Sequence, residues 1–324
     1  MRALVTGGTG FVGSHLIEAL LGAGDTVTAL VRNPGKAAGL AERGVRLVQG
    51  DLGNSQALRE ATRDQDAIYH SAGLVAALDE ATFLAINRDG TERLLRAAIE
   101  AGHPRFLFIS SLAAAGPSPR GGRRQGEEPP QPVSGYGRSK LAGESLVRAG
   151  PLPWIVIRPP GVYGPRDSEF LRLFQAARYG LLPVFEGGSQ ELSLVFVRDL
   201  ANALMMLART DAAIGGTFYP SHPEVVTSAE LARTIGRAMG KQVRLIPLPR
   251  FVARTALATS ALAARLTGGT TLLTPDKGNE LFAPAWTCDP TPLERVTGGR
   301  WRAEVDLKEG TRETAEWYQQ AGWV

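Results

Sequence analysis

Apolar residues in the first half of the chain form short runs that alternate with stretches of helical spacing. The short runs predict buried strands at residues 3–5, 26–31, 45–49, 67–70, 105–109 and 154–157. Apolar positions three or four apart predict helices that begin at Phe11 and near Lys36, and others that cover 80–101 and 136–148. This regular alternation is typical of an α/β fold with a doubly wound parallel sheet.

The pattern changes after Pro160, where strands become short and irregular and helices are predicted at 169–179, 199–209, 228–239 and 309–320. Thr227 and Glu230 predict a capped helix start, and Gly240 predicts the end of that helix. This half is too short for a second sheet of equal size, so it predicts a smaller α+β lobe that lines a pocket. We therefore expect one domain of residues 1–160, to which 193–219 return, and a substrate-binding lobe of 161–192 and 220–324.

Residues 116–133 are rich in Gly, Pro, Arg and Gln. That composition predicts a surface loop. Its length favours a mobile flap over a site rather than a linker.

Glycines stand between the first strand and the first helix. Gly8, Gly10 and Gly13 match G-x-G-x-x-G, and Gly7, Gly10 and Gly13 match G-x-x-G-x-x-G. Glycine lets the backbone turn tightly and approach a pyrophosphate, while the free N–H groups and positive dipole end of the helix face the anion. In this context the stretch predicts a dinucleotide site of the Rossmann type, with a merely structural turn as the alternative.

Polar side chains follow the second and third strands. Arg32 stands where a fold that prefers NAD would place a carboxylate to accept from the ribose 2′-hydroxyls. An arginine would pair with a 2′-phosphate, so the sequence predicts NADP(H) in preference to NAD(H), unless Arg32 is only a surface residue. Asp51 is expected to accept from an adenine amino group, with a cap on the next helix as the alternative.

Tyr136 and Lys140 are four residues apart at a helix start, so their side chains lie one turn from each other on one face. A neighbouring ammonium stabilises a phenolate, which predicts that Lys140 lowers the pKa of Tyr136 toward neutrality. Ser111 ends the fifth strand at the same sheet edge and is expected to polarise a substrate carbonyl. A helix or turn cap is the alternative for Ser111.

Further segments occur in a fixed order along the chain. They are Thr6-Gly7-Gly8-Thr9-Gly10-Phe11-Val12-Gly13, Gly50-Asp51-Leu52, His70-Ser71-Ala72-Gly73, Asn87-x-x-Gly90-Thr91, Ile109-Ser110-Ser111, Tyr136-Gly137-Arg138-Ser139-Lys140, Arg158-Pro159-x-x-Val162-Tyr163-Gly164-Pro165, Val197-Arg198-Asp199-Leu200-Ala201 and Leu307-x-Glu309-Gly310-x-x-x-Thr314-x-x-Trp317-Tyr318. With this set the chain resembles the extended short-chain dehydrogenase/reductase family over nearly its whole length.

The resemblance implies an NAD(P)-dependent enzyme. Ser111 and Tyr136 would lie at the substrate oxygen, and Lys140 would hold the nicotinamide ribose. Asn87 would brace a helix against the sheet, and two copies of the chain would pair as a homodimer through the helices of the Asn87 and Tyr136 segments. The expected cofactor contacts are Gly7, Gly10, Phe11, Val12, Gly13, Arg32, Asp51, Leu52, Ser71, Ala72, Gly73, Tyr136, Lys140, Pro159 and Val162.

Two branches of that family compete. One acts on nucleotide sugars as epimerases and dehydratases with tightly bound NAD, and the other interconverts hydrophobic ketones and alcohols, as dihydroflavonol-reductase-like and 3β-hydroxysteroid-dehydrogenase-like enzymes do. Nucleotide-sugar enzymes usually carry an arginine where this chain has Leu192, and often a histidine where it has Phe196. A leucine cannot pair with a phosphate, although Arg166, Arg172 or Arg250 are candidate substitutes.

The expected substrate is therefore a hydrophobic or aromatic ketone or aldehyde, or the matching alcohol. Its predicted pocket lining, of which about half would be lobe core, is Leu74, Val75, Leu112, Tyr163, Phe170, Phe174, Phe185 and Leu192. A non-catalytic protein that binds the dinucleotide for regulation is a third hypothesis. The presence of Ser111, Tyr136 and Lys140 argues against it.

Composition narrows the remaining alternatives. The single Cys288 excludes an internal disulfide, and no charged segment followed by an apolar one opens the chain, so a cytoplasmic location is expected. A net charge of +4 comes from scattered arginines, which argues against nucleic acid as a partner. The four histidines lack companions at ligand spacing, so no metal site is expected.

Residues 251–266 are rich in alanine and leucine, interrupted by Arg254 and Arg265. No apolar run in the sequence reaches the length of a membrane span. The segment resembles an insertion of the steroid-dehydrogenase-like branch and is expected to be a helix of the smaller lobe. A weak interfacial contact with a membrane is the alternative.

Overall fold

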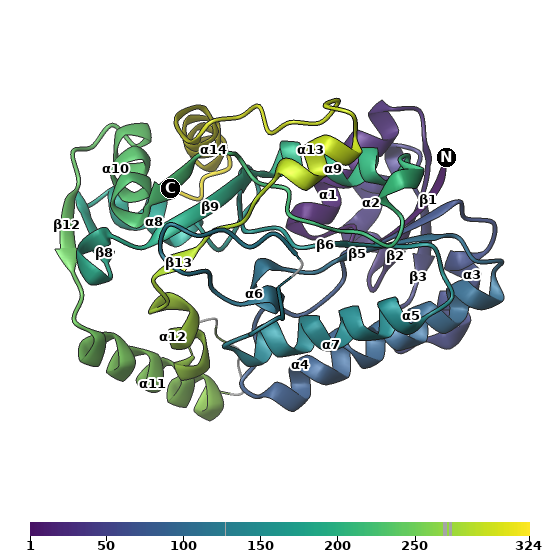
Figure 1. Ribbon diagram of the computed structural model, residues 1–324, viewed down its shortest axis with the longest axis horizontal. Coiled ribbons are helices and arrows are strands. Elements are labelled where there is room, and N and C mark those ends of the chain that lie inside the picture. Colours follow the sequence, from purple (N-terminus) through teal and green to yellow (C-terminus); the bar gives the residue numbers. More distant parts are fainter. Residues whose placement is uncertain (127, 268–270, 272–273) are drawn as a thin grey trace.

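A computed structural model describes residues 1–126, 128–267, 271 and 274–324. In this part of the chain, the largest sheet has seven parallel strands in the order β10-β6-β5-β4-β1-β2-β3 (Figure 1). Their bounds are β1 Arg2–Thr6, β2 Thr26–Val31, β3 Arg46–Gln49, β4 Ala67–His70, β5 Arg105–Ile109, β6 Trp154–Ile157 and β10 Thr217–Phe218. The predicted doubly wound α/β fold is confirmed.

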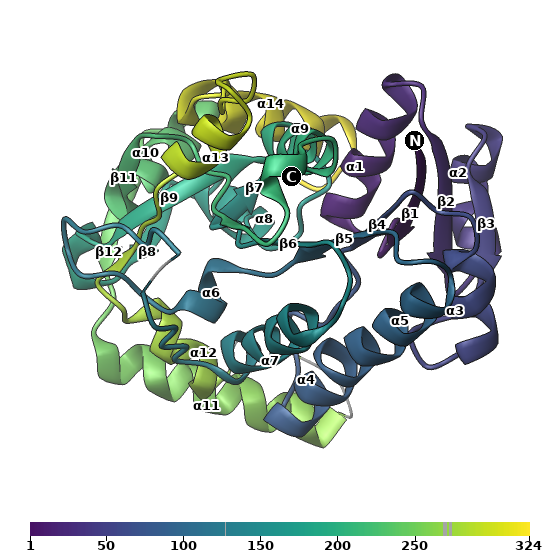
Figure 2. The same cartoon turned by 45° about the vertical axis from the view of Figure 1, so that its right-hand side comes forward.

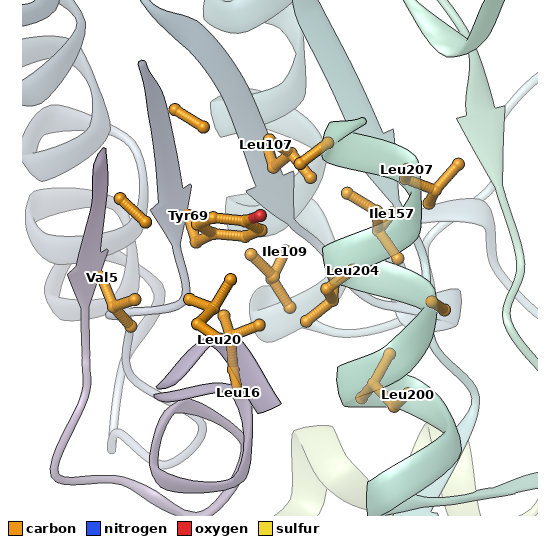
Figure 3. Close-up of a cluster of buried hydrophobic side chains, with 14 of the residues drawn as sticks. Val5, Leu16, Leu20, Tyr69, Leu107, Ile109, Ile157, Leu200, Leu204 and Leu207 are labelled. Atoms are coloured by element: carbon orange, nitrogen blue, oxygen red, sulfur yellow. The ribbon is translucent and has the colours of Figure 1, made fainter. Parts of the chain in front are cut away.

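Alternate residues of these strands face opposite helix layers. Val5 and Ile109 belong to a core beneath α1 (Phe11–Gly22) and α9 (Val197–Ala208), which cover one face of the sheet (Figure 3). Leu4 and Phe108 face the other side, where the covering helices are α3 Ser55–Thr62, α5 Asp89–Glu100 and α7 Gly135–Ala149 (Figure 2). A parallel sheet buried on both faces needs apolar residues at nearly every position, which explains the short continuous runs in the sequence.

Shorter helices fill the connections of this domain: η1 Pro34–Ala37, α2 Ala38–Glu42, α4 Glu80–Asn87 and α6 Leu112–Ala115. The expected single helix over 80–101 is divided into α4 and α5 at Arg88. Beside the break, the Thr91 hydroxyl donates to the Asn87 carbonyl at 2.7 Å.

The second half of the chain builds a smaller lobe. One sheet joins β7 Gly161–Tyr163, β9 Glu191–Phe196, β11 Val225–Thr227 and β13 Ala285–Trp286, and β8 Leu181–Val184 pairs with β12 Arg244–Pro247. Its helices are α8 Leu171–Ala177, η2 Glu186–Gly188, α10 Ser228–Ala238, α11 Arg250–Thr267, α12 Pro275–Leu281, α13 Thr291–Val296 and α14 Leu307–Gln320, and η3 Asp211–Ala213 precedes β10. Because β10 joins the large sheet, the chain returns to that sheet after β9. The domain boundaries expected at 160, 192 and 220 stay predictions.

The described part of the loop over 116–133 is fastened to the lobe by backbone hydrogen bonds. Ser118 N donates to Ala285 O at 3.1 Å, and Arg124 N donates to Thr287 O at 3.0 Å. Asp289 N in turn donates to Arg124 O at 2.9 Å. The segment for which a mobile flap was expected is therefore a connection that packs along β13.

Candidate active site

The turn between β1 and α1 requires glycine at particular positions. Gly7 has φ +75°, and a Cβ on it would lie 2.8 Å from Ala72 N. A Cβ on Gly13 would collide with the Gly7 carbonyl, which already accepts from Gly10 N at 2.9 Å. A Cβ on Gly10 would lie 3.2 Å from the same carbonyl oxygen, whereas one on Gly8 would meet side chains, the movable end of Ile17 at 2.7 Å and Ala29 Cβ at 3.4 Å. The frame that the backbone demands is therefore Gly7, Gly10 and Gly13.

This turn fits the pyrophosphate of a dinucleotide. Gly10 is the N-cap of α1 and gives the helix no side-chain cap, and the first turn, which starts with Phe11 and Val12, contains no acidic residue. The first N–H groups of a twelve-residue helix thus face the turn without a side-chain partner or a repelling charge. Residues 7–13 would hold the pyrophosphate there.

The segment after β4 lies against this turn and beside Lys140. Ala72 N donates to Thr6 Oγ1 at 3.2 Å, and a Cβ on Gly73 would lie 3.8 Å from Lys140 Nζ. Asn87 fixes the segment, because its Oδ1 accepts from Leu74 N at 2.7 Å and its Nδ2 donates to Ser139 Oγ at 2.9 Å. Asn87 braces the strand end against α7, as the sequence predicted.

A buried chain of hydrogen bonds fixes the tautomer of His70. Thr91 Oγ1 donates to the Asn87 carbonyl, so it accepts from His70 Nε2 at 2.9 Å. A neutral ring with its proton on Nε2 has Nδ1 as an acceptor, so Thr6 Oγ1 donates to His70 Nδ1 at 2.8 Å while it accepts from Ala72 N. Burial, with the Lys140 ammonium nearby, lowers the pKa of His70 to about 3. His70 is a neutral structural link between β1, β4 and α5.

Ser111, Tyr136 and Lys140 meet at the carboxyl end of β5. Ser111 caps α6 by accepting from Ala113 N at 3.1 Å, and its side chain lies close enough to the half-buried Tyr136 to lower the pKa of the phenol. The buried Lys140 donates to Ile109 O at 2.7 Å and lies 4.6 Å from the centre of the Phe108 ring. The helix-cap role considered for Ser111 is thus confirmed, and the polarisation of a substrate carbonyl stays a prediction.

The electrostatics of this trio differ from the expectation. Burial lowers the pKa of Lys140 to about 8, against a smaller raising effect of Glu144. Burial of the phenol, reinforced by the charge of Glu169, raises the pKa of Tyr136, and the nearby Ser111 side chain only partly opposes it. The prediction that Lys140 brings the pKa of Tyr136 toward neutrality is wrong in this structure, because loss of water dominates. Tyr136 is a protonated phenol at neutral pH, which is the form that donates a proton.

Helix α12 contributes residues that sequence reasoning missed. Gly135 N donates to Asp276 Oδ2 at 2.7 Å, and Ser134 Oγ donates to Glu280, so two carboxylates hold the start of α7. Lys277 Nζ lies 5.8 Å from the centre of the Tyr136 ring. A narrow crevice at this point is lined by Val75, Phe83, Tyr136, Thr274 and Lys277, among others. Thr274-Pro275 signals a helix start, but nothing in the sequence places that helix on α7.

A second missed group is a buried ion pair beneath the site. Arg158 donates to both carboxylate oxygens of Glu144, at 2.9 and 2.7 Å. Ser110 donates to the same carboxylate at 2.5 Å, and Arg158 also donates to Tyr219 Oη at 2.8 Å. Both charged side chains are almost fully buried, so the pair joins the strand ends of β5 and β6 to α7.

The residues expected at the adenosine end follow β2 and β3. Arg32 is exposed directly after the buried Val31. Asp51 is exposed, and its Oδ1 accepts from Gly53 N at 2.8 Å. The cap of α3 is Asn54, not Asp51, so the alternative interpretation of Asp51 as a helix cap is wrong. The Leu52 side chain is buried behind this turn.

The predicted pocket residues differ in how deeply they are buried. Tyr163 and Phe174 are buried in the lobe core. The ring of Phe174 packs edge-to-face on Tyr318, with 5.0 Å between the ring centres. Leu112 is buried in α6, and its N–H donates to the carbonyl of the buried Pro159 at 2.9 Å. The half-buried members are Leu74, Phe170, Phe185 and Leu192, together with the cofactor candidates Ser71, Ala72 and Val162, while Val75 is 49% exposed.

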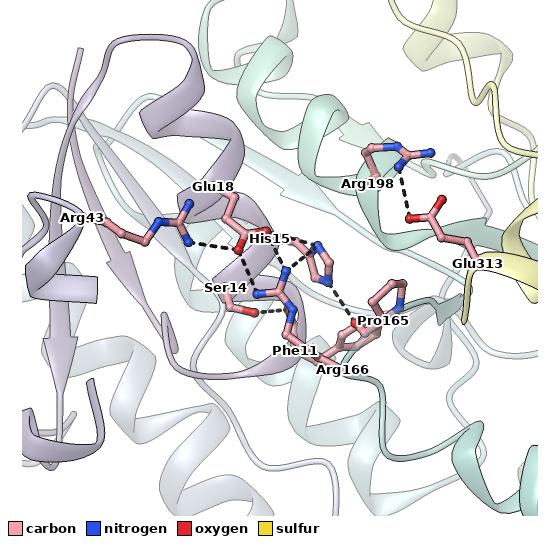
Figure 4. Close-up of polar contacts among 9 residues, drawn as sticks. All are labelled: Phe11, Ser14, His15, Glu18, Arg43, Pro165, Arg166, Arg198 and Glu313. Atoms are coloured by element: carbon pink, nitrogen blue, oxygen red, sulfur yellow. Dashed lines mark hydrogen bonds and ion pairs between the residues drawn. The ribbon is translucent and has the colours of Figure 1, made fainter. Parts of the chain in front are cut away.

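Two of the candidate phosphate-binding arginines are already paired. Arg166 donates to Glu18 of α1 at 2.6 and 3.1 Å, and its neighbour Pro165 accepts from His15 at 2.9 Å (Figure 4). Arg250 pairs with Glu186. The third candidate, Arg172, is exposed on α8.

A glycine turn at a parallel sheet edge, with Ser111, Tyr136 and Lys140 beside it, defines an NAD(P)-dependent enzyme of the extended short-chain dehydrogenase/reductase type. The sequence profile described as "NAD dependent epimerase/dehydratase family" matches residues 3–219. The chain belongs to this family.

Similar proteins include both branches of the family. A ceramide reductase of Caulobacter vibrioides is 34% identical over 321 residues, which cover 99% of this chain and 95% of that protein. A 4-hydroxy-2-methyl-3-oxo-4-farnesyl-3,4-dihydroquinoline-1-oxide ketoreductase of Stigmatella aurantiaca is 31% identical over 230 residues, 68% of this chain and 67% of that protein. The solved structure of a Thermus thermophilus UDP-glucose 4-epimerase with NAD is 25% identical, with a TM-score of 0.78 over 99% of this chain and 100% of that one.

Proposed function

We propose that the protein is an NADP(H)-dependent reductase of hydrophobic ketones or aldehydes, acting through Ser111, Tyr136 and Lys140. The observation that carries the proposal is that β9 contains no arginine that could bind the diphosphate of a nucleotide sugar. Leu192 and Phe196 occupy the relevant positions. Of the three candidate substitutes, Arg166 and Arg250 are held by Glu18 and Glu186, and Arg172 is exposed on α8 and not on β9.

In this proposal each of the three residues has its own role. A bound NADPH would supply the hydride to the carbonyl carbon. Tyr136, whose raised pKa keeps the phenol protonated at neutral pH, donates its proton to the carbonyl oxygen. Ser111 would donate a hydrogen bond to the same oxygen, and Lys140, whose ammonium donates to Ile109 O, would hold the ribose of the cofactor.

A lipid-like substrate is the favoured class. The two similar reductases carry ceramide and a farnesyl compound in their names, and both of these molecules have long apolar chains. Phe170, Phe185 and Leu192, half-buried in the lobe, offer apolar area to such a chain. The nucleotide-sugar epimerase alternative is not favoured, because β9 presents leucine and phenylalanine where a diphosphate would need a cation.

Ketones of increasing chain length test this function. Each added methylene should raise kcat/KM roughly threefold to fourfold until the pocket is full, because a buried CH₂ contributes about 0.8 kcal/mol. The measurement is NADPH oxidation by absorbance, with UDP-glucose and dTDP-glucose assayed in parallel for epimerisation or dehydration. Turnover of a nucleotide sugar with no ketone reduced would favour the other branch.

The NADP preference depends on Arg32. Arg32→Asp should reduce the ratio of NADPH to NADH affinity at least about tenfold, since a carboxylate repels the 2′-phosphate and accepts from the ribose hydroxyls. Fluorescence titration of both cofactors measures the ratio. Arg63→Asp is the matched control, because Arg63 is also exposed but precedes β4 at the opposite edge of the sheet. An unchanged ratio would show that Arg32 does not contact the phosphate.

The remaining features of the proposal come from the sequence and the resemblance. We propose a homodimer that works in the cytoplasm, with residues 251–266 as a helix of the smaller lobe. The cofactor and pocket residues named from the sequence also belong to this proposal.

A further inference from the structure

Helix α11 (Arg250–Thr267) has an apolar face turned away from the protein. The buried side chains of this helix are Ala253, Leu257 and Ala264, which lie on one side. On the opposite side Phe251 is 73% exposed, Leu262 57% and Leu266 80%. A surface helix usually exposes charged or polar residues to water, whereas this face of α11 exposes large apolar side chains.

The threonines on the exposed side do not make it polar. Thr255 Oγ1 donates to Phe251 O at 3.0 Å, and Thr259 Oγ1 donates to Thr255 O at 3.1 Å. Their hydroxyls thus donate to backbone carbonyls of the helix itself, and their methyl groups add to the apolar face. The face extends for most of a helix about 27 Å long.

The charges of α11 are of one sign and lie along one flank. The helix contains Arg250, Arg254 and Arg265 and no aspartate or glutamate. Arg250 pairs with Glu186, Arg254 lies 5.7 Å from the centre of the Phe282 ring, and Arg265 lies close enough to Asp79 to lower the pKa of that carboxyl. Arg254 is on the same helix turn as the exposed Phe251, so its cation is available to an anion that the apolar face approaches.

Among the described residues, α12 lies between α11 and the start of α7 at the candidate active site. Leu257 packs so tightly against α12 that a Cβ on Gly278 would lie 2.9 Å from its Cδ1. The other side of α12 carries Lys277 over Tyr136 and holds the start of α7 through Asp276. Figures 1 and 2 show α11 along the outer edge of the molecule, with α12 between it and α7.

We infer that α11 docks the protein on a phospholipid surface that contains anionic lipid. Phe251, Leu262 and Leu266 enter the boundary between headgroups and acyl chains, and Arg254 and Arg265 meet lipid phosphates. None of the described helices combines the length and apolarity needed to cross a bilayer, so the contact is peripheral. The docking would deliver a membrane-borne ketone to Tyr136. That use rests on the proposed function, whereas the docking itself does not.

The single cysteine allows a direct test. Cys288 is fully buried, so a fluorophore sensitive to polarity can be attached selectively to Leu262→Cys. Tyr179→Cys is the matched control, because Tyr179 is 81% exposed and lies outside α11. With vesicles of phosphatidylcholine and phosphatidylglycerol, emission should rise at least about twofold at position 262 and stay unchanged at 179. The rise should be smaller with phosphatidylcholine alone and in high salt.

A substitution series completes the test. Phe251→Ser/Leu262→Ser/Leu266→Ser should weaken vesicle binding in flotation at least about tenfold, while reduction of a short, water-soluble ketone stays unchanged. No emission change at 262, or an equal change at 179, overturns the inference. A second result would also overturn the inference: the unsubstituted protein does not bind vesicles and is a dimer in sedimentation velocity, whereas the triple variant is a monomer. The apolar face of α11 would then bind a second copy of the chain. Vesicle binding by a protein that reduces no ketone supports the docking surface and contradicts only the proposed function.

Discussion

Tyr136→Phe lowers kcat for ketone reduction at least about a hundredfold and leaves the affinity for the cofactor almost unchanged, if the phenol is the proton donor. The substitution removes one hydroxyl from Tyr136, a residue near Ser111 that lines the crevice with Phe83 and Lys277. No group expected to touch the cofactor phosphates is altered. Steady-state kinetics and cofactor titration measure the two quantities, with the exposed Tyr179→Phe as a control.

Lys140→Ala provides the contrast. Its ammonium lies beside Gly73 and donates to Ile109 O, so its removal should weaken cofactor binding and also lower the rate. Equal and mild effects of Tyr136→Phe and Lys140→Ala would place the proton transfer on another group.

Local signals in the sequence predicted most of the first domain, because its strands and helices are specified by residues close together in the chain. The run at 26–31 is a strand with the predicted bounds. Thr227 and Glu230 form the predicted capping box, and Gly240 ends that helix with φ +67°. Caps and buried strands depend on a few neighbouring residues, so a pattern is enough to predict them.

The neighbours of the catalytic candidates were not predictable in this way. Asp276 contacts Gly135 across 141 residues, and Glu280 contacts Ser134 across 146. No periodicity relates such distant positions, because lobe packing alone brings them together. Spacing placed Lys140 one turn from Tyr136, but the pKa of the phenol depends on how much water surrounds it, which spacing does not specify.

The apolar pocket residues illustrate the same limit. Phe174 and Phe185 both occur in lobe segments predicted to reach the site. Phe174 turns into the core against Tyr318, whereas Phe185 packs on Phe282 at 5.4 Å beside α12. Residue type indicates burial, but the direction of burial is a property of the packed lobe.

Glu144→Ala should lower the free energy of unfolding by about 3–5 kcal/mol, because it leaves the Arg158 guanidinium buried without its carboxylate. Ser110 would lose its acceptor in the same step, and water cannot replace it easily where both ionic side chains are at most 3% exposed. Urea unfolding followed by circular dichroism measures the change.

Two further variants show whether the loss comes from the uncompensated charge. Glu92→Ala breaks a comparable but exposed pair with Arg96 and should cost less than about 0.5 kcal/mol. The double variant Glu144→Leu/Arg158→Met removes both charges while keeping apolar volume, and it should regain most of the stability lost in Glu144→Ala. A double variant as unstable as Glu144→Ala would mean that packing, and not the unpaired cation, dominates at this position. A loss below about 1 kcal/mol in Glu144→Ala would mean that water reaches Arg158, and the strand ends beneath Ser111 would then be less rigid than the hydrogen bonds of Glu144 indicate.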